Sequence, residues 1–82
     1  MIRVTAKFFG PLKELVQCDE MMVDVPAPGR GEDAFEQLAQ QHPALRPWKA
    51  SLRLAVNLEY TTFNHVLRSG DEISFIPPVS GG

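Results

Sequence analysis

One long amphipathic helix pattern stands among short alternating stretches, and this arrangement limits the possible folds more than any other feature of the chain. In the segment EDAFEQLAQQHP, residues 32–43, Phe35, Leu38, Ala39 and His42 recur at helical spacing. Two acidic residues open the segment, where they favour the positive end of a helix, and its final proline disfavours continuation. A helix with one apolar face must bury that face against another layer of structure.

Stretches that alternate apolar and polar residues predict strands with one buried face. They are IRVTAKFF (2–9), MMVDVP (21–26), LRLAVN (52–57) and EISFIP (72–77), with YTTF (60–63) as a brief fifth strand. The first two would pair as a hairpin-like return, and Gly70 would supply the positive φ of a turn before the last. This order predicts an α+β domain, in which a sheet of four or five strands packs on one main helix.

Two segments between these elements carry weaker signals. PLKELVQ (11–17) follows a Gly-Pro pair and predicts a short helix, with Leu12, Leu15 and Val16 facing inward. ALRPWKA (44–50) is expected to be irregular, with Trp48 packed over the edge of the core.

Size and charge restrict the class of protein. A chain of 82 residues has room for one domain, and its net charge is −2, with eight basic residues that form no run. This argues against nucleic acid or an anionic membrane as the main partner. Neither a signal peptide nor an apolar run of about 20 residues is present, and the single Cys18 fits a reducing compartment. We therefore expect a cytoplasmic location.

Groups suited to catalysis or metal binding do not converge in the sequence. Asp19 and Glu20 beside Cys18 would raise the pKa of its thiol, the wrong direction for an activated nucleophile. His42 and His65 lie far apart, and with one cysteine they make a poor zinc set. The sequence predicts no metal site and no internal catalytic site, and it assigns no role to this cysteine or to the two histidines.

The last eight residues, FIPPVSGG, combine a stiff stem with a slender tip. Pro77 and Pro78 favour extended geometry, whereas Gly81 and Gly82 lack Cβ atoms and can enter a channel too narrow for other residues. From Pro77 onward the tail could reach roughly 20 Å at ~3.3 Å per residue. A terminal carboxylate reacts as an acyl donor only after activation, for example as an acyl-adenylate. An inert, frayed end is the alternative.

Three stretches resemble one known family: FFGPLKEL (8–15), LAVN (54–57) and LRSGDEISFIPPVSGG (67–82). The chain resembles the small sulfur-carrier subunits of molybdopterin synthase, the MoaD-like group of ubiquitin-like β-grasp proteins. The resemblance covers the whole chain, the middle third more loosely. It implies a β-grasp domain over residues 1–76, with a mixed four- to five-stranded sheet, and an extended tail over residues 77–82.

The resemblance also implies a chemical cycle in which the chain is a non-catalytic, sulfur-donating subunit that binds no cofactor itself. In this family an E1-like adenylating enzyme uses ATP to activate the terminal glycine, here Gly82. A sulfur donor protein then supplies the sulfur of a thiocarboxylate. The tail enters the large subunit of molybdopterin synthase and donates sulfur to cyclic pyranopterin monophosphate. Two large and two small subunits form the family's complex.

Site residues carried over from the resemblance fall into three groups. Gly82 would carry the sulfur and Gly81 would give it clearance. The inserted stem would comprise Pro77, Pro78, Val79 and Ser80. The surface that contacts partners would include Tyr60, Phe75 and Ile76.

The sequence departs from the family at four places. Leu and Phe are more usual at the positions of Tyr60 and Ile76, Arg is frequent at the position of Lys13, and the loop APGRGEDAF before the main helix differs. Other functions stay open: a ubiquitin-like modifier joined to lysines, a sulfur carrier for thiamine, cysteine or tRNA thiolation, or an interaction domain with an inert terminus.

Overall fold

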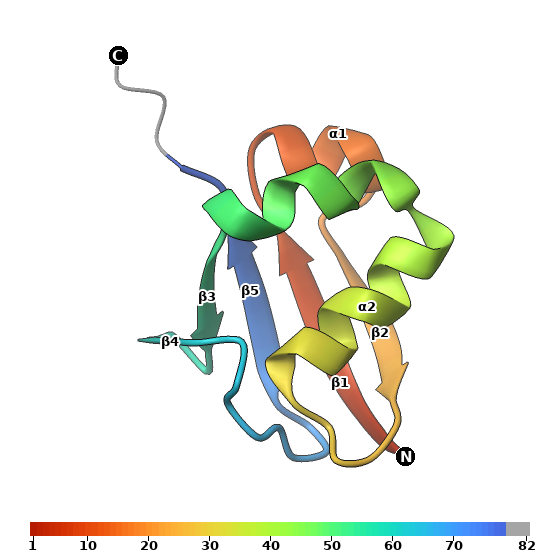
Figure 1. Ribbon diagram of the computed structural model, residues 1–82, viewed down its shortest axis with the longest axis vertical. Coiled ribbons are helices and arrows are strands. Elements are labelled where there is room, and N and C mark those ends of the chain that lie inside the picture. The colour runs from red at the N-terminus through yellow and green to blue at the C-terminus, as the bar shows by residue number, and fades with distance from the viewer. Residues whose placement is uncertain (79–82) are drawn as a thin grey trace.

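The computed structural model of the chain describes residues 1–78 and places all the helices on one side of a five-stranded sheet (Figure 1). The elements in chain order are β1 (Ile2–Phe8), α1 (Pro11–Val16), β2 (Glu20–Val25), α2 (Gly31–Gln41), the 3-10 helix η1 (Pro43–Ser51), β3 (Arg53–Val56), β4 (Glu59–Thr61) and β5 (Glu72–Ile76). The predicted strands and the main helix are all present, with bounds that shift by up to two residues.

The strand order is β2-β1-β5-β3-β4, so the first and last strands lie side by side at the centre. β1 pairs with β2 in antiparallel register, as the hairpin-like return predicted, and it pairs with β5 in parallel register. β3 is antiparallel to both β5 and β4. The sheet is therefore mixed, and the α+β prediction with five strands is confirmed.

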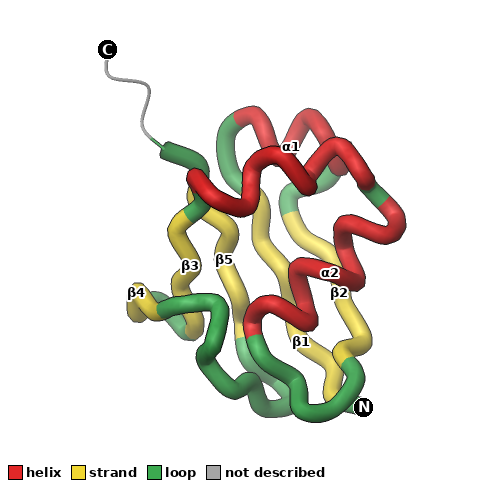
Figure 2. Tube along the Cα trace, in the orientation of Figure 1, coloured by secondary structure: helices red, strands yellow, loops and turns green. Residues whose placement is uncertain are grey.

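The core lies between α2 and the sheet face that α2 covers (Figure 2). Phe35, Leu38 and Ala39 of α2 are buried, as the helical spacing predicted. The ring of Phe75 on β5 stacks on Phe8 at 6.0 Å between centroids and meets Phe35 at 5.9 Å. β1, β2, β3 and β5 contribute alternate residues to this core, so their other residues occupy the opposite face of the sheet.

Two local predictions were wrong. The segment after α2 is a 3-10 helix rather than irregular chain; a bidentate ion pair between Arg46 and Glu36 joins it to α2. Leu15 is 36% exposed, because α1 has only six residues and its inward side is occupied by Leu12 and Val16. The expectation for Trp48 is confirmed, since it packs against the edge of the core.

Candidate functional site

The sheet face opposite α2 is not covered by any helix within residues 1–78 (Figure 1). It carries large exposed apolar side chains. Tyr60 on β4 is 69% exposed and shares this face with Ala55, its partner on β3. Ile76, at the end of β5, is half-buried. The structure thus places two of the predicted partner-contact residues on one open face.

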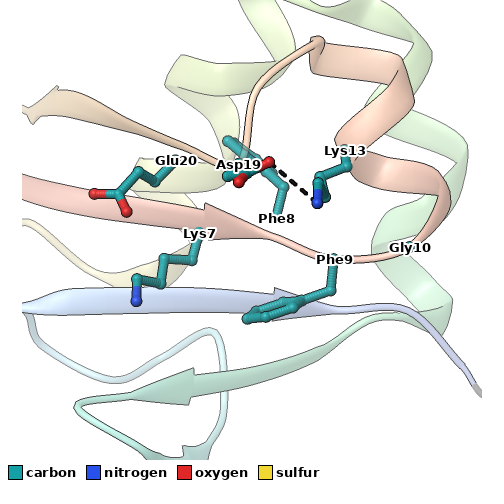
Figure 3. Close-up of a pocket in the computed structure, with 7 residues that line it drawn as sticks. All are labelled: Lys7, Phe8, Phe9, Gly10, Lys13, Asp19 and Glu20. Carbon is teal, nitrogen blue, oxygen red and sulfur yellow. Dashed lines mark ion pairs between the residues drawn. The ribbon is translucent and has the colours of Figure 1, made fainter.

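Phe9 belongs to the same face and was not singled out from the sequence. Phe8 pairs with Phe75, so Phe9 follows level with Ile76, and it points away from the core because successive side chains alternate. Its ring is 44% exposed and lies across the end of β5 (Figure 3). A signal was available: in a Phe-Phe pair that ends a half-buried strand, one ring must face outward.

Arg53 lies on the same face, next to the exposed ring of Tyr60. It pairs directly with Ile76 across β3 and β5, and its guanidinium carbon lies 5.9 Å from the centre of the Tyr60 ring. We call Phe9, Arg53, Tyr60 and Ile76 the outer patch. Its members come from the loop after β1 and from β3, β4 and β5, so the patch forms only when the whole sheet is assembled.

Phe75 does not belong to the outer patch. Its side chain is 1% exposed and packs between Phe8 and Phe35. Alternation along β5 sends Phe75 into the core and Ile76 outward, which corrects the expectation that both contact a partner. Phe75 supports the outer patch from behind.

The outer patch borders the start of the predicted tail. Pro77 and Pro78 follow directly after Ile76, the last residue of β5. A hollow on the surface is lined by these three residues and by Ser51, Arg53 and Tyr60. Gly10, at φ +56, lies so close to Pro77 that a Cβ built on the glycine would stand 3.5 Å from Pro77 Cγ. The turn between β1 and α1 therefore lies beside Pro77, the first residue of the predicted tail. Val79, Ser80, Gly81 and Gly82 lie outside the described residues.

Residues 6–82 match the family described as the ThiS family. The chain belongs to the ThiS family. Among curated relatives, the molybdopterin synthase sulfur carrier subunit of Mycobacterium tuberculosis is 36% identical over 85 residues, with both chains covered completely. This match extends through the tail as well as through the sheet.

Solved structures similar to this ThiS-family chain agree with the fold. SAMP1 (small archaeal modifier protein 1) from Haloferax volcanii matches with a TM-score of 0.87 and 28% identity, covering 98% of this chain and 99% of that one. A chain in a protein–protein complex of subunits 1 and 2 of molybdopterin-converting factor from Helicobacter pylori matches with a TM-score of 0.68 and 28% identity. The match covers 99% of this chain and 100% of that chain.

Charges near the outer patch of this ThiS-family chain are mostly neutralised in pairs. Lys7 Nζ lies 3.4 Å from Glu72 Oε2, and Lys13 Nζ lies 3.2 Å from Asp19 Oδ1 beside a second pocket (Figure 3). All four side chains are partly or largely exposed, so each pair contributes little to stability.

The opposite end of β5 is held by a polar turn. Gly70 has φ +92, as its predicted turn role requires, and Asp71 accepts hydrogen bonds from the Arg68 backbone N–H (2.8 Å) and the Asn57 amide (3.0 Å). Burial raises the pKa of Asp71, but these hydrogen bonds outweigh burial and leave the pKa below its usual value. This turn positions the strand that leads to the tail.

Residues 1–78 also contain the cysteine and the two histidines that the sequence singled out. No group of three or more His, Cys, Asp or Glu side chains there could hold a metal ion. Cys18 is a half-buried free thiol, and His65 Nδ1 shares a hydrogen bond with the Thr61 hydroxyl at 3.1 Å. The helices of the described part of the chain are also too short or too polar to cross a bilayer.

Proposed function

We propose that this chain is the sulfur-carrier subunit of a molybdopterin synthase in molybdenum cofactor biosynthesis. The observation that carries the proposal is the match over both full chains to a curated carrier subunit, at 36% identity. The fold adds a physical argument. β5 leads from the centre of the sheet directly into Pro77 and Pro78, beside an exposed apolar patch suited to protein contacts.

In the proposed cycle the carboxylate of Gly82 is the reacting group. An adenylating enzyme transfers AMP from ATP to this carboxylate and releases pyrophosphate, because a free carboxylate has no leaving group. A sulfur donor protein then supplies sulfur at the oxidation level of sulfide, which bonds to the acyl carbon, displaces AMP and leaves a thiocarboxylate. Gly81 and Gly82 let this group enter a narrow channel, while Val79 and Ser80 line the inserted stem with the two prolines.

The proposed acceptor is a substrate held by the synthase large subunit, which provides the acid–base groups. A complex of two subunits in the converting factor of Helicobacter pylori supports this arrangement, because a chain of that complex shares the present fold. The outer patch is the surface that would seat on the large subunit.

The test is reconstitution with purified adenylating enzyme, sulfur donor and large subunit. Intact-mass analysis should show replacement of one carboxyl oxygen by sulfur, dependent on ATP, and the product should convert cyclic pyranopterin monophosphate to molybdopterin. Deletion of Gly82 should abolish both results while the domain stays folded by circular dichroism. Unmodified protein under sulfur-replete conditions, with molybdoenzyme activity intact after the deletion, would contradict the proposal.

A second candidate function is covalent protein modification. It is favoured by the likeness to SAMP1, at 28% identity and a TM-score of 0.87. In that case Gly82 would end as an amide on a lysine of another protein. Isopeptide-linked conjugates that disappear when Gly82 is deleted would support this function, and their absence from cells that make thiocarboxylate would oppose it.

A further inference from the structure

Arg53 is the basic residue of the outer patch, and it forms no ion pair with another residue of the range 1–78. The ion pairs among residues 1–78 involve Arg3, Lys7, Lys13 and Arg46, and none involves Arg53. Its side chain is exposed on the open sheet face, where the guanidinium packs over Tyr60. Stacking on an aromatic ring holds a guanidinium in place but leaves its N–H donors available.

The surroundings of Arg53 select a particular ligand chemistry. The other residues that line the hollow are Ser51, Tyr60, Ile76, Pro77 and Pro78. Arg53 is thus the single charged member of this lining, next to apolar side chains that would exclude water once covered. A guanidinium in such a place forms a short bidentate bond to a carboxylate.

We propose that Arg53 is a specificity-determining residue that binds an aspartate or glutamate side chain of the protein that receives the tail. This inference rests on the proposed function, which makes that protein the synthase large subunit. A phosphate-rich partner is disfavoured, because it would need several basic groups and the hollow offers one. The apolar side chains around Arg53 instead resemble the centre of a protein–protein interface, where apolar contacts surround an arginine.

The position of Arg53 gives the proposed bond a consequence for sulfur transfer. Arg53 is the direct strand partner of Ile76, the residue that precedes Pro77. A carboxylate bound there fixes the register between the two proteins immediately beside the point where the tail starts. The bond therefore orients the stem toward the acceptor's channel, in addition to any affinity that it contributes.

The test measures binding of the full chain to the purified large subunit of the same organism, by calorimetry at low and moderate salt. We expect Arg53→Leu to weaken binding roughly tenfold and Arg53→Glu roughly hundredfold. The loss should be smaller for Arg53→Lys, which keeps the positive charge but cannot form a bidentate bond to a carboxylate. The salt dependence of the dissociation constant should flatten for Arg53→Leu. Arg68→Glu is the matched control, an exposed arginine in the turn before β5, and should bind nearly as the unchanged protein does.

A cross-linking experiment identifies the partner group. The Arg53→Lys chain is mixed with the large subunit and a carbodiimide, which joins an amine to a carboxylate that it contacts. We expect an amide between position 53 and one aspartate or glutamate of the large subunit, located by peptide mass spectrometry and absent from the Arg68→Lys control. Reversal of that acidic residue to lysine should restore binding to Arg53→Glu.

The outcomes separate this inference from the function on which it rests. If the unchanged protein does not bind the large subunit, the proposed function fails and this inference with it. If the unchanged protein binds and Arg53→Glu binds equally well, the role of Arg53 is overturned while the proposed function stands. Equal losses for Arg53→Lys and Arg53→Leu without a cross-link would show that Arg53 only supports Tyr60, which also overturns the proposed bond.

Discussion

The two faces of the sheet are made by the same strands but differ in how far their side chains are exposed to solvent. On the covered face, Val4, Phe8, Ile73 and Phe75 are at most 2% exposed and pack against α2 and one another. On the open face, Tyr60 is 69% exposed and Met22 57%, with charged side chains between them. One face stabilises the fold, and the other is free to meet a partner.

The open face is itself divided along its strands. Toward the start of β5, Asn57, Asp71 and Glu72 form a polar cluster in which the Glu72 backbone N–H donates to the Asn57 side chain at 3.0 Å. Toward the end of β5, the outer patch brings Phe9 and Ile76 together next to the tail. The start of β5 is therefore held in a polar cluster, whereas its end belongs to the outer patch. Substitutions can test this difference.

The largest effect is expected for Phe75→Ala. Truncation of this ring leaves a cavity between Phe8 and Phe35 and should lower the free energy of unfolding by about 3–5 kcal/mol. Urea denaturation followed by circular dichroism measures it. Ile76→Ala is the matched control one residue further, and its loss should stay below about 1.5 kcal/mol because that side chain is half-buried. Equal losses would remove the distinction between the faces.

Phe9→Asp, in contrast to Phe75→Ala, should affect binding to the large subunit more than the stability of the fold. An aspartate in the outer patch replaces an exposed ring with a charge and should weaken binding to the large subunit by about 2–3 kcal/mol. Calorimetric titration measures this change, and the melting temperature should move by only a few degrees. Met22→Asp is the control, on the same face but on the edge strand β2, and it should bind normally. Weakened binding of this variant would extend the interface beyond the outer patch.

A smaller effect is expected for Gly31→Ala, at the start of α2, where the helix lies against Leu54 of the covered face. A Cβ there would lie 2.7 Å from Leu54 Cδ2 and 3.2 Å from the Phe63 carbonyl oxygen. The side chain can move but the backbone carbonyl resists, so the unfolding free energy should fall by about 1–2 kcal/mol. Thermal unfolding is the measurement. An unchanged or raised melting temperature would show that α2 shifts freely on the sheet.

The smallest effect concerns the polar end of the open face and depends on pH. The pKa of Asp71 is lowered in the folded state, so its contribution is present above the unfolded carboxyl pKa of about 3.9 and is lost as pH falls through the folded pKa. Asp71→Asn should lower the melting temperature by about 4 °C at pH 7, which corresponds to about 1 kcal/mol. Melting curves of the two proteins should converge near pH 2. A constant difference across pH would assign the effect to shape rather than charge.

Alternation of apolar and polar residues was sufficient to predict the strands. Successive side chains of a strand point to opposite faces, so a strand with one buried face needs an apolar residue at every second position. The same rule separates Phe75 from Ile76 and sends Phe9 outward, yet these consequences were missed when residues were assigned by resemblance. The 3-10 helix of Pro43–Ser51 has no comparable signature: it includes Pro47, and its ion pair with Glu36 joins it to a separate element, α2.

Arg53 shows why the remaining part of the site escaped prediction. Within its strand it reads as an ordinary outward-facing polar residue. Its environment depends on Tyr60 and Ile76, which reach it through strand pairing. Pairing of β1 with β5 joins residues near opposite ends of the chain, and no local pattern indicates it.

The central place of β5 has a mechanical consequence. A partner that draws on the chain beyond Ile76 applies force along β5, which is bonded on one side to β1 and on the other to β3. Under such a pull the hydrogen bonds of both ladders are loaded together in shear, instead of opening one after another as in a peeled edge strand. The domain should therefore act as a firm anchor, so that a pull on the chain beyond Ile76 would not unravel the sheet.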